Sequence, residues 1–438
     1  MMNKDALKKF FTDNKKVILI VSILIVVIGI ICGIVSWILM MDKKIEEGVQ
    51  DSTDNKVNKE EVIDNNVVEK DGYRTIALLG IDAGEEGVPR SDTIMLANIN
   101  ENTGEIQLVS LYRDSFLYIE DWSKRSVAID GEVDYTKINH AYQMGVDKTL
   151  KALNQNLALH ITDYVAVDFI TVARIVDAVG GIEVTIPDKA NFIYYLNGMG
   201  RQAASMAGEK YKELSNSKRG KTVTLDGFQA LGYCRVRKGN VDGYPLKGES
   251  DYTRAARQQE VINKVVDKIK SEGLTNGISL IDELVDICGN KENMSTSFSY
   301  DEIKELAVDA LKKGYSLSDG GKLQFPFKPH EVKMWKGVRK NYVSSQFSDT
   351  SLIDDVKELH ALLYPDKELT EEELERVEEI SDQLEIYEKR FCDEEYYKPP
   401  ITPTPAPTAS AKTGETMKPT ASAKARETVS PTAGAKVR

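Results

Sequence analysis

Residues 17–41 form a run of 25 residues without one charged side chain, and this run constrains the 438-residue chain more than any other feature. About 20 apolar residues in a helix cross the hydrocarbon core of a bilayer. Five lysines precede the run and only Lys43 and Lys44 follow closely, and a cytoplasmic flank carries the excess of positive charge. The sequence therefore predicts a cytoplasmic N-terminus over 1–16, a transmembrane anchor over 17–41 and an extracytoplasmic remainder. No small-residue cleavage site follows, which favours an uncleaved signal-anchor over a cleaved signal peptide.

Composition divides the rest of the chain. Residues 42–70 are rich in Asp, Glu, Lys and Asn and predict a polar linker. Residues 71–365 carry the strand and helix patterns of a folded domain. Residues 366–395 hold fourteen acidic and four basic side chains, with apolar residues every three or four positions. This pattern predicts an amphipathic helix within 366–398, which either packs on its own domain or forms a short coiled coil.

Residues 399–438 repeat the sequence PTASAK or PTAGAK every twelve residues, and Pro, Thr, Ala and Ser dominate. Such a composition cannot bury a core and predicts a disordered tail. The tail carries six basic and two acidic residues, opposite in sign to the net charge of −12 of the whole chain. It is therefore either a tether for an anionic polymer or a solvated tail without a role.

The segment from residue 75 to residue 114 predicts three apolar strands, with charged side chains at their ends. Asp82 ends the first strand, Arg90 and Asp92 begin the second, and Arg113 and Asp114 follow the third. Mg²⁺ binds one or two carboxylates together with phosphate oxygens and water. Asp82 and Asp92 are therefore the candidate ligands of a magnesium ion.

A second group of charges lies near residues 235–258. If residues 233–237 form a strand, Arg235 and Arg237 point to the same face. In a helix starting near residue 253, Arg254 and Gln258 lie on one stripe beside Arg257. Guanidinium groups bind phosphate oxygens through paired hydrogen bonds and keep their charge, so this group predicts a pyrophosphate site; the alternative is a set of surface arginines paired with neighbouring carboxylates.

Strands alternating with helices predict an α/β fold with a mixed central sheet. Helices are expected over 138–159, 171–179, 225–232 and 253–270, and strands over 164–169 and 182–186. Residues 188–222 are expected to be a polar excursion, and 276–365 to add helices and short strands. The four histidines have no metal-ligand spacing, and no phosphate-binding P-loop, serine-hydrolase elbow or dinucleotide fingerprint occurs. An acidic extracytoplasmic chain without a helix-turn-helix signature also excludes a nucleic-acid partner.

Seven segments in this order resemble the LytR-CpsA-Psr family of cell-envelope phosphotransferases: LLGID, RSDTIML, VSLYRD, KINHAY, VGGIEVTIP, YCRVR and DYTRAARQQ. Two positions depart from the family pattern, because Tyr112 stands where proline is usual and Thr253 where glycine is usual. Both departures spare the charged residues. The resemblance implies a three-layer α/β/α domain that moves a glycopolymer, of teichoic acid or capsule type, from a polyprenyl-pyrophosphate carrier to a peptidoglycan hydroxyl.

The resemblance also implies roles for the charged residues. Asp82, Asp92, Arg113 and Asp114 are the expected catalytic residues, with Asp82 or Asp114 as the proton acceptor. The pyrophosphate is expected to contact Arg90, Arg113, Arg235, Arg237, Arg254, Arg257 and Gln258, and Mg²⁺ to bind Asp82 and Asp92. The prenyl chain is expected between the strand of Val165 and Val167 and a covering helix. A pyrophosphatase, and a non-catalytic envelope regulator or wall-binding protein, are the alternative functions.

Overall fold

The computed structural model describes residues 57–64, 66–82, 88–125, 133–237, 239–241, 244–288, 294–318, 323–333, 341–344 and 351–391. Within these ranges no helix has both the length and the apolar character needed to cross a membrane. The predicted anchor over 17–41 and the predicted tail over 399–438 lie outside the described residues.

A mixed sheet in the order β11-β6-β1-β2-β3-β12 forms the centre of the fold, and β13 also pairs with β3. The strands β1, β2 and β3 run antiparallel, whereas β6 is parallel to β1 and both β12 and β13 are parallel to β3. The three strands predicted between residues 75 and 114 are thus confirmed. The strands of the sheet are β1 (Tyr73–Asp82), β2 (Arg90–Asn100), β3 (Glu105–Leu111), β6 (Asp163–Asp168), β11 (Met294–Thr296), β12 (Ser316–Leu317) and β13 (Leu323–Phe325).

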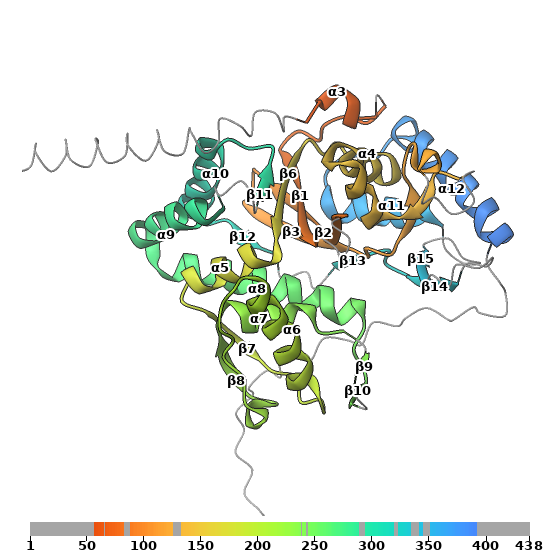
Figure 1. Ribbon diagram of the computed structural model, residues 1–438. Coiled ribbons are helices and arrows are strands. Elements are labelled where there is room, and N and C mark those ends of the chain that lie inside the picture. The colour runs from red at the N-terminus through yellow and green to blue at the C-terminus, as the bar shows by residue number, and fades with distance from the viewer. Residues whose placement is uncertain are drawn as a thin grey trace, which may run out of the picture. The chain divides into compact units, whose positions relative to one another are not determined.

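Helices α4 (Val146–Leu157), α11 (Leu352–Leu363) and α12 (Glu371–Phe391) cover one face of the sheet (Figure 1). Leu79, Leu96 and Val109, one from each central strand, share a single hydrophobic core with these helices. The acidic helix α12 begins at a capping box, because the backbone N–H groups of Glu373 and Thr370 each donate to the other residue's side chain. Its apolar stripe is buried in the same core, so α12 packs on its own domain.

Helices α5 (Phe169–Ala178), α8 (Asp251–Ser271), α9 (Gly273–Cys288) and α10 (Tyr300–Lys313) lie on the other side (Figure 1). Ser110 points away from the core of Val109, and its Oγ accepts a hydrogen bond from Nε2 of Gln259 in α8 at 2.8 Å. Helices therefore pack on both faces of a mixed sheet, as the α/β pattern predicts.

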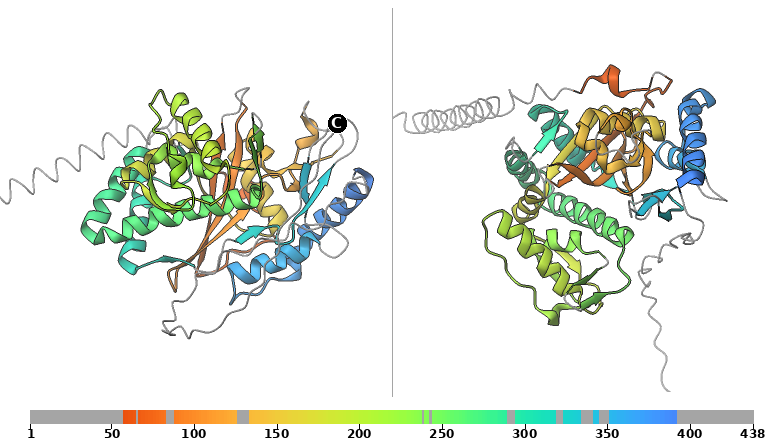
Figure 2. Two further views of the ribbon diagram at one scale, coloured as in Figure 1. Left: turned by 90° about the horizontal axis from the view of Figure 1, so that it is seen from below. Right: turned by 45° about the vertical axis from the view of Figure 1, so that its right-hand side comes forward.

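A lobe with its own hydrophobic core projects from the sheet (Figure 2). This core contains residues from a two-stranded hairpin and from several helices, among them Val184, Phe192 and Leu225. The lobe consists of β7 (Ile182–Thr185), α6 (Phe192–Met206), a 3-10 turn (Asn216–Lys218), β8 (Thr222–Leu225), α7 (Gly227–Arg235), β9 (Gly239–Val241) and β10 (Tyr244–Leu246).

The structure corrects three predictions about local structure. Residues 188–222 contain helix α6, whose apolar residues Phe192, Ile193 and Leu196 are buried, although glycines and polar residues obscure the pattern in the sequence. Helix α7 starts at a capping box and runs to Arg235, with Val236 as its C-cap, so Arg235 and Arg237 do not lie on a strand. The predicted linker ends earlier than residue 70, because Val57, Val62 and Val67 are buried in the main core.

The predicted helix over 138–159 is divided at Gly145, which has a φ of 105°. A 3-10 helix (Ile138–Met144) precedes α4, and both contribute buried residues to the core. The remaining elements are α3 (Lys59–Val62), β4 (Phe116–Tyr118), a 3-10 turn (Trp122–Lys124), β5 (Tyr135–Lys137), β14 (His330–Lys333) and β15 (Asn341–Ser344).

Candidate active site

A β-bulge sets the position of Asp92. Gly80 pairs with Thr93 and Ile81 pairs with Ser91, so Asp92 is an extra residue in β2. A bulge bends the strand locally and redirects a side chain, and bulges are common beside active sites. Asp82 ends β1 opposite the exposed Arg90, which begins β2.

The residues that follow β3 bind the Asp92 carboxylate. Nη1 of Arg113 donates to Oδ2 of Asp92 at 2.5 Å, and Nδ2 of Asn139 donates to Oδ1 at 3.2 Å. Asp114 accepts a hydrogen bond from Nζ of Lys137 at 2.7 Å. Both carboxylates are therefore held in place by cations or amides, with their side chains about one-fifth exposed.

Helix α8 brings two further predicted residues to this point. Arg254 and Gln258 line a small cavity together with Asp92, Arg113 and Asp251. Nη1 of Arg254 lies 3.2 Å from Oδ1 of Asp251, and these two residues are three positions apart in α8. Ser250 caps the helix, and the positive end of the helix dipole favours an anion near its first turn.

Helix α7 adds Arg235 and, two residues beyond, the exposed Arg237. The guanidinium of Arg235 lies over the ring of Phe169 at 5.0 Å. Burial lowers the pKa of Arg235, while Asp82 and Asp92 oppose this effect and Arg237 adds to it. These mutual influences place the ends of β1, β2 and α7 around one site.

Burial lowers the pKa of Arg254 to about 10. The carboxylate of Asp251 acts to raise this pKa, and the positive charge of Arg113 lowers it further. For Arg113, burial alone would lower the pKa, but the carboxylates of Asp92, Asp251 and Asp114 outweigh burial and raise it. Both guanidiniums thus keep their charge at neutral pH. Nε of Arg113 and Nε of Arg254 are buried, and neither has a hydrogen-bond acceptor among the residues that the structure describes.

The comparison with known families agrees with this arrangement. The LytR_cpsA_psr family matches residues 38–336, which is more than half of the chain. The chain belongs to the LytR_cpsA_psr family.

Relatives of this chain include transferases. A polyisoprenyl-teichoic acid–peptidoglycan teichoic acid transferase TagU of Enterococcus faecalis is 31% identical over 239 residues, which cover 54% of this chain and 65% of that protein. The transferase of the same name from Oceanobacillus iheyensis is 29% identical over 265 residues, covering 59% of this chain and 69% of its own length. The crystal structure of protein gbs0355 from Streptococcus agalactiae has a TM-score of 0.51 and 23% identity, and it covers 68% of this chain and 90% of that one. That likeness shows the shared fold.

In this LytR_cpsA_psr protein, Arg257 has a different role from the predicted phosphate contact. Its side chain is buried, with Nη1 2.6 Å from Oε2 of Glu249. Its Nε donates to the Tyr233 carbonyl at 2.9 Å, and its Nη2 donates to the Val236 carbonyl. The donors of Arg257 are thus used inside the protein, where they fasten α8 to the end of α7 next to Arg235 and Arg237.

Three residues at the site were not among the predicted site residues. Lys137 and Asn139 hold Asp114 and Asp92, and Asp251 lies 3.2 Å from Arg254. All three occur in segments that carry the family resemblance, KINHAY and DYTRAARQQ. The resemblance of those two segments to the family was the available signal.

A magnesium ion at this site would take few ligands from the protein, because both oxygens of Asp92 already accept hydrogen bonds from Arg113 and Asn139. Asp82 and Asp92 both act on the charge of Arg235, so they lie near the same guanidinium. Over the described parts of the chain, no group of three or more His, Cys, Asp or Glu side chains could hold a metal. Two carboxylates are enough for Mg²⁺ when phosphate and water supply the other oxygens.

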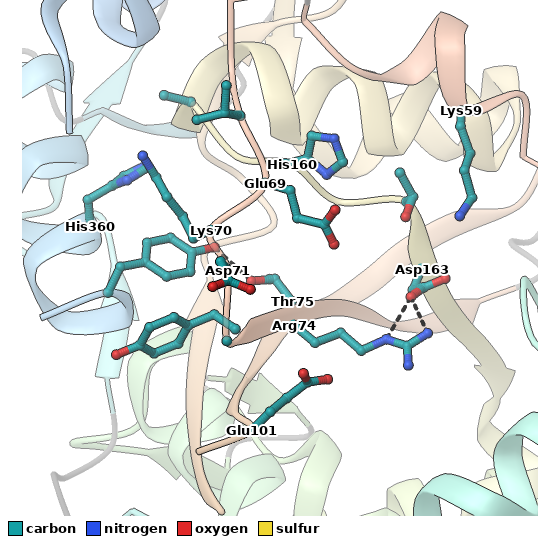
Figure 3. A pocket seen from close by; sticks show the side chains of 16 residues that line it. Lys59, Glu69, Lys70, Asp71, Arg74, Thr75, Glu101, His160, Asp163 and His360 are labelled. Carbon is teal, nitrogen blue, oxygen red and sulfur yellow. Dashed lines mark hydrogen bonds and ion pairs between the residues drawn. The ribbon is translucent and has the colours of Figure 1, made fainter. Parts of the chain in front are cut away.

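A larger cavity, of about 400 Å³, lies at the other end of β1 (Figure 3). Arg74 and Asp163 form an ion pair in its wall, with Nη2 2.7 Å from Oδ2. His360 is buried beside it, and its Nε2 donates to the Leu157 carbonyl at 2.9 Å. Burial lowers the pKa of His360; the hydrogen bond to Leu157 opposes this and Lys70 adds to it.

The lowered pKa of His360 predicts a pH dependence of stability. The unfolded chain takes up a proton on this histidine at a higher pH than the folded protein does. Stability is therefore retained above the ordinary histidine pKa, about 6.5, and decreases as the pH falls below that value. Urea unfolding should therefore give a lower free energy at about pH 5.5 than at about pH 7.5. His360→Gln keeps a donor for Leu157 and should show a smaller difference; an equal difference in both proteins would exclude His360 as the cause.

Proposed function

We propose that this protein transfers a glycopolymer of the teichoic acid type from a polyprenyl-pyrophosphate carrier to a hydroxyl of peptidoglycan. The observation that carries the proposal is the gathering of arginines beside Asp92: Arg113 and Arg254 line one small cavity with it, and the exposed Arg237 acts on the charge of Arg254. A pyrophosphate carries several negative charges and would accept charge-assisted hydrogen bonds from guanidinium groups gathered in this way. The transferases among the relatives support the substrate class.

In the proposed reaction a hydroxyl oxygen of peptidoglycan attacks the phosphorus that is bonded to the glycopolymer. A new phosphorus–oxygen bond forms, the bond from that phosphorus to the bridging oxygen breaks, and polyprenyl phosphate leaves with the electron pair. Asp82 or Asp114 accepts the hydroxyl proton. Arg113, Arg235, Arg237 and Arg254 neutralise the charge on the phosphates, which is the main contribution that a protein makes to phosphoryl transfer.

The prenyl chain requires an apolar surface beside the arginines. Leu78, Val165 and Val167 are half-buried and share one face of the sheet, opposite to the core of Leu79. We propose this face as the prenyl site. The proposal places the enzyme at the cell membrane, held by an anchor over 17–41, with the tail over 399–438 in contact with anionic wall polymer.

Magnesium is proposed as the cofactor, bound by Asp82 and Asp92. When bound, it would neutralise phosphate charge and orient the pyrophosphate. We expect EDTA to stop transfer by the wild type, and Asp82→Asn to weaken magnesium binding because one anionic oxygen ligand is lost. Isothermal titration with Mg²⁺ in the presence of a pyrophosphate analogue measures the second effect. Undiminished transfer in chelator, with metal shown absent by elemental analysis, would mean that the arginines act alone.

The proposed function is tested by reconstitution. Purified full-length protein is mixed with a labelled polyprenyl-pyrophosphate-linked glycopolymer and washed wall fragments. We expect label to become covalently attached to the fragments, and to be released from them by enzymes that degrade peptidoglycan. Label that never attaches, with a protein that is folded and has bound the donor, would reject the proposal.

A further inference from the structure

Helix α6 contains two glycines, and packing explains one of them. A Cβ at Gly200 would lie 2.5 Å from the ring of Tyr211 and 2.7 Å from the carbonyl oxygen of Phe228, so the contact between α6 and α7 requires glycine there. A Cβ at Gly198 would meet nothing within 4 Å. Glycine is among the least favourable residues inside a helix. Packing therefore does not require glycine at position 198, and the missing side chain leaves an open space beside α6.

That space belongs to a cavity of about 560 Å³ on the surface of the projecting lobe. Tyr194, Gly198 and Gln202 follow one another at helical spacing on α6 and form one wall, and residues 213–216 form the other. Tyr194 is 40% exposed, although most large apolar residues of the domain are buried. The size lies within the range of small-molecule and cofactor sites, about 300–1,000 Å³.

The two walls are fixed to each other by Asn197. Its Oδ1 accepts hydrogen bonds from the backbone N–H of Leu214 at 2.9 Å and from the Tyr211 hydroxyl at 2.8 Å. Its Nδ2 donates to the Leu214 carbonyl at 2.9 Å. The cavity is therefore pre-formed, which reduces the entropy lost when a ligand binds.

The chemistry of the lining indicates an uncharged ligand with many polar groups. Its one cation and one anion, Arg201 and Glu213, form an ion pair with each other. The other polar groups at the surface are the amides of Gln202 and Asn216 and the hydroxyl of Ser215. Amides and hydroxyls bind hydroxyl and acetamido groups, and an exposed tyrosine ring provides a flat apolar surface. An anionic polymer would find no unpaired cation in this lining.

The cavity lies near the segment that follows Arg237. Tyr195 also lines the cavity, and a Cβ at Gly239, two residues after Arg237, would lie 2.8 Å from its ring. A chain-like ligand held in this cavity would therefore lie beside the segment that carries Arg237.

We propose that this cavity binds the uncharged glycan chain of peptidoglycan and presents its hydroxyl to the arginines. A sugar ring lies on Tyr194 in the space that Gly198 leaves open, and Gln202 and Asn216 bind its polar groups. This inference rests on the proposed function, because it assigns the acceptor of that reaction. It identifies the cavity as an acceptor site, separate from the anionic donor.

The test measures binding of peptide-free peptidoglycan glycan strands to the full-length protein by isothermal titration calorimetry. Tyr194→Ala should weaken binding roughly three- to tenfold, the scale of one aromatic contact. Gly198→Leu fills the cavity and should weaken binding by about tenfold or more, with an unchanged or higher unfolding temperature because its side chain enters open space. Met206→Ala is the matched control, since Met206 is a 68% exposed residue of the same helix outside the cavity lining.

Transfer kinetics separate this inference from the proposed function. Both cavity variants should raise the KM for wall acceptor and leave the KM for the lipid-linked donor unchanged. Arg237→Ala should still bind glycan strands with wild-type affinity. Glycan binding that is absent, or equal in the wild type, Tyr194→Ala and Gly198→Leu, would overturn the acceptor site while the proposed transfer stands. A teichoic acid fragment that binds in the cavity in place of the glycan would overturn it as well.

Discussion

Replacing Arg237 with alanine is expected to lower glycopolymer transfer roughly 30- to 1,000-fold, which corresponds to about 2–4 kcal/mol of transition-state stabilisation. Arg237 is exposed, and its charge acts on both Arg235 and Arg254. It is therefore placed to bind phosphate and contributes no buried packing. Initial rates on a lipid-linked donor measure the loss, and the unfolding temperature should stay the same.

Arg219→Ala provides the control for this variant. Arg219 is also an exposed arginine of the lobe, and its Nε lies 2.8 Å from the exposed carboxylate of Asp188. Its removal should leave the rate within about twofold, because exposed ion pairs contribute little. Near-normal transfer by a well-folded Arg237→Ala protein would remove Arg237 from the site.

Replacing Arg257 with alanine is expected mainly to lower the free energy of unfolding. The change breaks a buried ion pair with Glu249 and leaves the carbonyls of Tyr233 and Val236 without their donors. Loss of one partner of a buried pair typically costs about 3–5 kcal/mol. Glu249 keeps a contact with Nζ of Lys189 at 2.7 Å. We therefore expect the free energy of unfolding to fall by an amount near the lower end of that range, about 3 kcal/mol.

Urea unfolding monitored by circular dichroism measures the free energy of the Arg257→Ala protein. Transfer should also fall, because α7 ends at Arg235, between the two carbonyls that Arg257 binds, and Arg237 lies just beyond them. A variant with wild-type stability and strongly reduced pyrophosphate affinity would show the opposite of this account, namely that Arg257 contacts the substrate.

The central part of the fold was predictable because its signals are local. The apolar strands β1 to β3 are separated by turn residues, and α8 combines a cap at Ser250 with a regular apolar stripe. Helix α6 was not predictable, because Gly198 and Gly200 interrupt its apolar pattern. The short spacing of Arg235 and Arg237 favoured a strand, whereas the capping box at Asp226 and the burial of residues 227–234 extend α7 through Arg235.

The residues of the candidate site were recognisable by type, but their individual roles depend on tertiary contacts. Arg254 and Arg257 are alike in the sequence and lie three positions apart, yet Arg254 lines the cavity of Asp92 and Arg257 is bound to Glu249. The bulge that makes Asp92 an extra residue in β2 arises from pairing with β1. Such features depend on distant strands and helices, which a local pattern does not contain.

The most direct test of the proposed function is the stoichiometry of the products. Full-length protein, magnesium, a donor labelled in both its polyprenyl and its glycopolymer parts, and peptidoglycan acceptor are combined, and the products are separated. The account predicts one polyprenyl monophosphate released for each glycopolymer joined to peptidoglycan through a phosphodiester, with little release when the acceptor is omitted. Equal release of polyprenyl phosphate with and without acceptor, together with free glycopolymer phosphate, would contradict it and identify the protein as a pyrophosphatase.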